Sequence, residues 1–425
     1  MTITTRRPLA AVCAAFALGA VSGDYSGKYA KDPRMQKLLR ELPAAKKKAL
    51  DDVRTKLQLE PKQADRIRVV VEDAIEAEPG LLAPFRGTAF TTETDEDASD
   101  TPVVVRLRAE FLMNGCHDLA TALRHEMVHA VMRERMNGPA YRALPKWLRE
   151  GIAVWAAGQG ESKLLFALTD PGALEKLDAA FPGVDEGDHG VDRYAEYFLA
   201  LDFLEQRGQG SAAGGAVARL VALLVNGVAV DQAVEQVSGS SFDEFKKKAH
   251  AHALDVASSR EPEGRSDFKA LVAFDKKRNY AEAKAAAAKF EEQHPRSPFL
   301  ADALYLRGKA ERLSDDPKAA IATLERLVNG MLAQTHFFDE AWYQLGSARL
   351  ALVQLAPAGE AFQTILRDYP DTSLQDKAAL RLAQVLGKQG QKKAALAWLD
   401  RFDRSFPKSG SADEARKLRD QLDAK

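Results

Sequence analysis

Residues 118–138 read DLATALRHEMVHAVMRERMNG, and this stretch is expected to form a helix around which the surrounding fold is organised. Asp118 is suited to cap the start of the helix, apolar residues recur along it at helical spacing, and an Asn-Gly-Pro sequence is suited to end it. His125 and His129 are four residues apart, so on a helix both imidazoles project from one face toward one ion. Glu126 is next to the first histidine, close enough to take a proton from metal-bound water without being a ligand. The pattern therefore predicts a metal site on this helix.

A second stretch, PKWLREGIA at residues 145–153, follows soon after. Together the two stretches resemble the gluzincin group of zinc metallopeptidases, in particular peptidase MA-like domains, whose second helix carries a ligand in a Trp-Leu-x-Glu-Gly-x-Ala setting. The resemblance implies that Glu150 is the third Zn2+ ligand, beside His125 and His129. Two histidines and one glutamate are a known ligand set of catalytic zinc, which keeps a fourth position open. The reaction implied is hydrolysis of a peptide bond.

Packing and support around the ligands can also be predicted. Pro145 is expected near the start of the second helix, and Gly151 and Ala153 are small enough to let that helix pack against the first. At Val154, four residues after Glu150, some relatives of the group place a carboxylate that supports a zinc-binding histidine. In this chain such support must come from another residue or be absent.

The neighbouring segments extend the resemblance. Residues 66–71, 85–92 and 103–108 look like strands, and the last occupies the place of the family's sheet edge, which pairs with an extended substrate. Downstream, residues 193–197 resemble the helix that follows the ligand helix, and the resemblance makes Tyr194 the candidate donor of a hydrogen bond to the oxyanion. Alternatively, Tyr194 and its neighbour Tyr197 are half-buried packing residues.

The first 23 residues describe a secretory signal peptide. Two arginines precede a short apolar run, and small residues follow it. An uncleaved N-terminal anchor helix is the alternative, although the run is shorter than the roughly 20 residues that a span needs. We therefore expect an exported protein, periplasmic or secreted, with no membrane span in the mature chain.

Composition limits which groups could bind a metal. The two cysteines, Cys13 and Cys116, provide neither a disulfide framework nor a thiolate cluster, so His and carboxylates must hold any metal. The net charge is −1, from 60 basic and 61 acidic residues, and therefore suggests no nucleic-acid partner. The acidic run at 93–100 is interpreted as a solvated loop rather than a calcium site. The six other histidines are expected to be solvated or locally bonded: His117, His189, His250, His252, His294 and His336.

The C-terminal third is periodic. Ala283, Ala320, Ala358 and Ala395 recur at intervals of 37, 38 and 37, and large apolar residues recur at the same intervals. One copy, with Trp342, Leu345, Gly346, Ala358, Phe362 and Pro370, resembles the tetratricopeptide (TPR) repeat, slightly lengthened. About four helix pairs are expected over residues 266–408, with 412–422 as a cap. An unrelated helical bundle is the alternative.

The predicted organisation is therefore a signal peptide at 1–23, a peptidase MA-like domain at 31–258, a linker at 259–265 and TPR-like repeats at 266–425. The predicted fold is an α+β zincin-like catalytic domain, with a small sheet plus helices, followed by an all-α TPR-like solenoid. One function is an exported zinc metallopeptidase, with Glu126 as general base, whose repeats recruit a peptide or protein substrate, or a protein partner on the concave face. The alternative is a non-catalytic TPR scaffold with a vestigial zincin domain.

Overall fold

The computed structural model describes residues 25–73, 90–93, 103–113, 118–136, 138–170, 183–184, 193–207, 215–369 and 372–424. Several predicted features lie outside these residues: the signal peptide, Cys13, Cys116, His117, His189, Pro370 and nearly all of the acidic run. Among the described helices, none combines the length and the apolar character that crossing a membrane requires.

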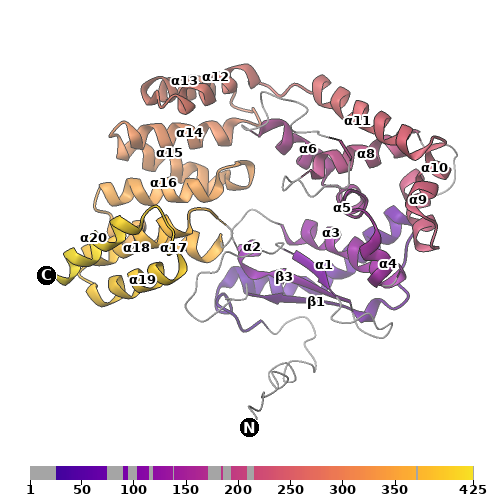
Figure 1. Ribbon diagram of the computed structural model, residues 1–425, viewed down its shortest axis with the longest axis horizontal. Coiled ribbons are helices and arrows are strands. Elements are labelled where there is room, and N and C mark those ends of the chain that lie inside the picture. Colours follow the sequence, from indigo (N-terminus) through magenta and orange to yellow (C-terminus); the bar gives the residue numbers. More distant parts are fainter. Residues whose placement is uncertain are drawn as a thin grey trace, which may run out of the picture.

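The N-terminal part combines a small sheet with helices, and the helical repeats stand beside it (Figure 1). Its elements are α1 (Pro33–Leu57), η2 (Ala64–Arg66), β1 (Ile67–Glu72), β2 (Phe90–Glu93), β3 (Val103–Arg108), α2 (Ala109–Met113), α3 (Leu119–Met136), α4 (Gly138–Ala143), α5 (Lys146–Ala156), α6 (Gly160–Thr169), α8 (Tyr194–Arg207), α9 (Gly215–Val225), α10 (Val230–Ser238) and α11 (Phe242–Ser259). One apolar core joins the sheet to α1, α3, α5, α8 and α9.

The sheet has the order β1-β3-β2 in the described residues. β1 runs parallel to β3, and β2 runs antiparallel to it. The prediction that residues 103–108 form the sheet edge is therefore wrong, because β3 is the central strand and is paired on both sides. Alternation determines only which face of the strand is buried: Val103, Val105 and Leu107 lie in the core shared with α3. The strand that lies at the edge beside α3 is β2.

The helices that carry the metal-site residues begin where the sequence predicts. Asp118 accepts hydrogen bonds from the backbone N–H groups of Ala120 and Thr121, which caps α3. Pro145 stands at the cap position of α5. The packing prediction for Gly151 is wrong in its partner: a Cβ there would lie 2.9 Å from the carbonyl oxygen of Tyr197, so Gly151 brings α5 close to α8 rather than to α3.

Four helix pairs and a final helix form the C-terminal part. They are α12 (Arg265–Lys276) with α13 (Tyr280–Gln293), α14 (Leu300–Leu313) with α15 (Pro317–Gly330), α16 (Phe338–Ala351) with α17 (Leu355–Asp368), α18 (Gln375–Lys388) with α19 (Lys392–Ser405), and α20 (Ala412–Asp423); η3 (Leu332–Gln334) precedes α16. The turn inside each pair has one residue in the left-handed region of backbone conformation: Arg278, Asp315, Val353 and Gly390. These four residues are 37, 38 and 37 positions apart, the same intervals as those between the recurring alanines.

The periodic residues form the core of the repeats. The four recurring alanines are fully buried, as are Phe290, Leu327, Ile365 and Phe402 at the corresponding large positions. At Gly308 and Gly346 a Cβ would lie 2.5 and 2.9 Å from the side chains of Leu324 and Phe362, respectively. The small residue of one helix therefore makes room for the large residue of its partner, as the periodicity predicts.

Candidate metal centre

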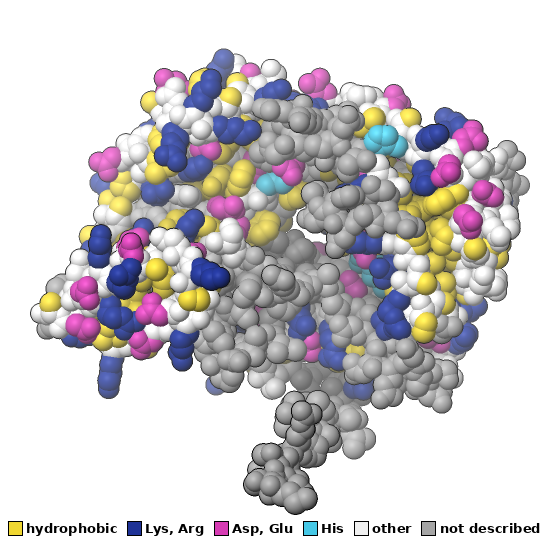
Figure 2. Space-filling model, viewed as in Figure 1, with side chains coloured by type: hydrophobic (Ala, Val, Ile, Leu, Met, Phe, Trp, Pro, Cys, Tyr) yellow, Lys and Arg dark blue, Asp and Glu magenta, His cyan; other side chains and the backbone are white. Residues whose placement is uncertain are grey.

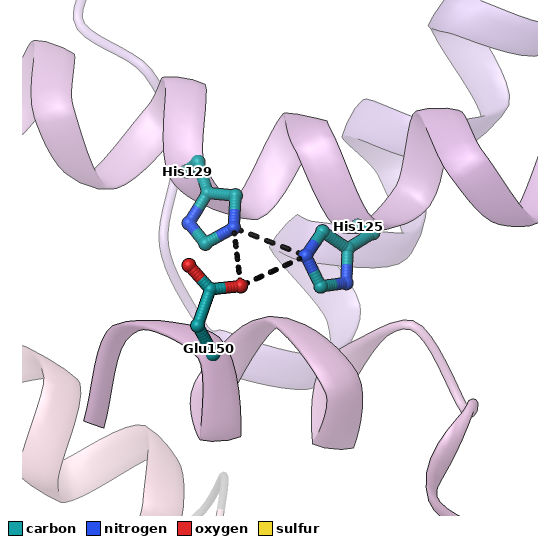
Figure 3. A group of neighbouring side chains, drawn as sticks. All are labelled: His125, His129 and Glu150. Carbon is teal, nitrogen blue, oxygen red and sulfur yellow. Dashed lines mark hydrogen bonds and ion pairs between the residues drawn. The ribbon is translucent and has the colours of Figure 1, made fainter. Parts of the chain in front are cut away.

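His125, His129 and Glu150 meet between α3 and α5 (Figure 3). The two Nε2 atoms are 3.1 Å apart, and Oε2 of Glu150 lies 3.3 Å from Nε2 of His125 and 3.5 Å from that of His129. The side chains are 12%, 9% and 18% exposed, respectively, so the cluster is largely enclosed but reaches solvent. The structure thus brings together the three residues that the sequence predicts as ligands.

These separations fit one tetrahedral zinc ion. With metal–ligand bonds of about 2.0–2.2 Å, two ligand atoms of a tetrahedral site lie about 3.3–3.6 Å apart. The three observed distances are within a few tenths of an ångström of that range. The donor set, two imidazole nitrogens and one carboxylate oxygen, also matches a catalytic zinc site with one position left for water.

The electrostatics of the cluster favour a cation at its centre. Burial lowers the pKa of His129, but the Glu150 carboxylate outweighs burial and raises that pKa above its ordinary value. Burial raises the pKa of Glu150, and the His129 charge with hydrogen bonds from both histidines reverses this, so the pKa lies well below its usual range. Glu150 therefore stays ionised, and a proton or a metal ion competes for the same three atoms.

The second nitrogen of each histidine also has a partner. The Nδ1 atom of His129 is 2.5 Å from the hydroxyl of Tyr141 on α4, and the Nδ1 atom of His125 is 2.8 Å from Oε1 of Gln159 at the start of α6. Both rings are thus oriented with Nε2 toward Glu150. These two residues supply the support that Val154 cannot, and no pattern in the sequence singled them out.

Glu126 and Tyr194 flank the centre. Glu126 is 5% exposed and belongs to α3, next to the first histidine. Tyr194 is half-buried at the start of α8, and its ring centroid lies 6.2 Å from that of His125. Tyr197 is buried in the core instead. Of the two tyrosines, Tyr194 is therefore the one beside the ligands, while Tyr197 has the packing role.

The other described histidines lie elsewhere. His250 and His252 face Glu196 and Asp202, and His294 is bonded to Asp267 within the repeats. His336 is bonded to Asp302, also within the repeats. These contacts fit the prediction of solvated or locally bonded histidines, except that His336 also lies 2.9 Å from the carbonyl oxygen of Phe166 on α6.

Comparison with known proteins bears on the C-terminal part. Residues 302–329 and 340–372 match the tetratricopeptide repeat family. The helical repeats of the C-terminal part are therefore consistent with a TPR-like solenoid. No curated protein and no solved structure matches the chain significantly.

TPR repeats suggest a protein-interaction role for this part of the chain. On the face shown in Figure 2, basic and acidic side chains are interspersed over the repeats. That face of the repeats therefore shows no strong bias toward either sign of charge.

Proposed function

We propose that this chain is an exported zinc-dependent metallopeptidase that hydrolyses peptide bonds and whose TPR repeats recruit a protein substrate or partner. The observation that carries the proposal is the spacing of the three donor atoms, 3.1, 3.3 and 3.5 Å, which fits one tetrahedral Zn2+. The adjacent Glu126 supplies the general base that such a site needs. A zincin-like fold, with a small sheet under the ligand helix, is part of the proposal.

His125, His129 and Glu150 would hold the ion. When bound, zinc supplies Lewis acidity and lowers the pKa of a coordinated water to about 7. Glu126 is positioned to accept a proton from the attacking water and to deliver it to the leaving amine. Tyr194 contributes a phenol hydroxyl, which can donate a hydrogen bond where negative charge develops on the carbonyl oxygen.

Two uncharged side chains would keep the histidine ligands in their orientation. Tyr141 and Gln159 contact the two imidazole rings at Nδ1 and are themselves uncharged, so each Nε2 faces Glu150 and would be available to hold the ion. The edge strand β2 lies beside α3 and runs antiparallel to β3. It therefore offers the backbone edge along which an extended substrate would lie.

Two measurements on the purified full chain test the proposal. Metal analysis should find one zinc per folded chain, and His129→Ala should lose it. Glu126→Gln should keep the zinc and lose hydrolysis of an unfolded protein such as casein, because the base is gone while the ligands stay. A folded protein without stoichiometric zinc would refute the site. Equal hydrolysis by Glu126→Gln and the unchanged protein would show that another source cleaves.

The TPR match specifically favours a second candidate, a scaffold whose repeats do the work. In that case Glu126→Gln would leave the biological function intact, whereas substitutions on the repeats would abolish it. Comparing these two classes of variant in one functional assay separates the candidates.

A further inference from the structure

Helix α6 lies between the metal centre and the TPR repeats. It begins directly after Gln159, whose side chain is bonded to the ligand His125. Farther along, Lys163 lies 4.8 Å above the ring of Tyr194. Phe166, two turns after Gln159, touches the repeats. One short helix thus contacts a metal ligand, the proposed oxyanion donor and the solenoid.

The contact with the repeats is made by His336, in the loop before α16. Its ring stacks on that of Phe166, with centroids 3.8 Å apart, and its Nε2 atom lies 2.9 Å from the Phe166 carbonyl oxygen. Its Nδ1 atom lies 2.6 Å from Oδ2 of Asp302, which is fully buried. Because both nitrogens face acceptors, the ring donates on both sides as an imidazolium.

Asp302 makes this arrangement rigid. It also accepts hydrogen bonds from the hydroxyl of Thr335, at 2.6 Å, and from the backbone N–H of His336, at 2.8 Å. The groups that face His336 are therefore Asp302 on α14, the Phe166 carbonyl on α6 and the charge of Asp170 at the end of α6. All three favour the protonated ring, so the contact is a charge-assisted one.

On the other side, α6 packs on α8. A Cβ at Gly160 would lie 2.1 Å from the Phe198 ring, and Leu164 and Leu168 share a buried cluster with Ala195 and Leu199. Because α6 packs this closely on α8, a displacement of α6 is expected to move Gln159 and the start of α8 with it.

We propose that docking of His336 on Phe166 positions α6, so that the TPR repeats help to hold the metal ligand His125 in its binding orientation. His336 is a positioning residue in this proposal, since it acts through α6 and Gln159 and does not contact the ligands. The inference rests on the proposed zinc site. It gives the repeats a second task besides recruitment: a partner that loosens this loop would weaken the metal centre.

The test compares His336→Ala with His294→Ala in the full chain. His294 is the matched control because its hydrogen bonds go to Asp267 on α12 and to Glu263 just before α12, rather than to α6. Two readouts are measured: zinc affinity by competition with a chromogenic chelator, and amide hydrogen exchange of residues 160–169 in the zinc-free protein. A second variant, His336→Phe, keeps a ring against Phe166 but removes both hydrogen bonds, and circular dichroism verifies that each variant is folded.

We expect His336→Ala to speed exchange in α6 and to weaken zinc binding by about threefold to tenfold. That is less than the 10- to 100-fold typical of removing a direct partner of a ligand. His336→Phe should show a smaller change in the same direction, and His294→Ala none. Unchanged zinc affinity in a folded His336→Ala protein overturns the proposal, whether or not exchange changes. Absence of zinc binding in the unchanged protein would instead refute the zinc site, a separate outcome.

Discussion

Replacing Tyr141 with Phe tests whether the support of the zinc ligands is as the structure shows it. The change removes one oxygen, 2.5 Å from Nδ1 of His129, and keeps the ring in the core. Both residues are buried, with Tyr141 4% and His129 7% exposed as whole residues, so the freed N–H is largely shielded from water. An unsatisfied buried donor costs about 1–3 kcal/mol. Since each 1.4 kcal/mol is a factor of ten, zinc affinity should fall about 5- to 150-fold.

The assay is competition for zinc between the protein and a chelator of known affinity at pH 7.5, with stoichiometry from metal analysis. Tyr194→Phe is the control, because it removes the same atom type from a tyrosine beside His125. It should leave zinc affinity unchanged and reduce hydrolysis instead, by about 100-fold or more if its hydroxyl serves the oxyanion. If Tyr141→Phe binds zinc as tightly as the unchanged protein, the hydroxyl does not hold His129 and the reasoning fails.

Three further predictions concern stability, each measured by urea unfolding. Val353→Asn should raise the free energy of unfolding by about 0.5–1 kcal/mol, because a β-branched residue at φ 57° is strained and asparagine tolerates this backbone conformation. The Val353 side chain is 66% exposed, so the change costs little packing. Asp315→Asn, at φ 60°, is the control and should change the free energy of unfolding little. Tyr29→Phe should lower the free energy of unfolding by about 1 kcal/mol, because it removes the hydroxyl bonded to the buried Asp368, which keeps its ion pair with Arg367. An unchanged free energy of unfolding would show that this hydrogen bond does not contribute to stability. Burial lowers the pKa of His336, but the bond to Asp302 outweighs it and raises that pKa. The part of the stability that comes from the protonated ring, and that His336→Ala removes, should therefore be fully present below about pH 6.5 and be lost as pH rises through the raised pKa, leaving only the stacking on Phe166. The opposite trend would mean that the ring is neutral when docked.

Local signals in the sequence predicted a large part of the structure. The helix of residues 119–136, its cap at Asp118 and the i, i+4 histidine pair depend on contacts within one or two turns, which the spacing of residue types encodes. The repeats were predictable for the same reason, since each buried alanine and glycine recurs beside the large residue that it accommodates.

Features that depend on contacts between distant segments were not predictable. Nothing in the pattern of residues 103–108 tells whether a strand is central or at the edge, and the structure places β3 between β1 and β2. Gly151 has to be small because α8 packs against it, and α8 begins more than forty residues later in the chain. Tyr141 and Gln159 likewise have no motif, because a hydroxyl and an amide can support a histidine from any element that passes close to it.

The cost of the cluster argues against a vestigial site. His129 and Glu150 are largely enclosed together, and taking a charged group out of water costs several kcal/mol before its partners offset that cost. Replacing such a buried charged group by apolar residues of similar size is often neutral or stabilising. A buried arrangement of this kind is retained where it performs a function. The three donor atoms at zinc-like spacing, with each histidine oriented by its own neutral partner, therefore support the proposed metal site over a vestigial one.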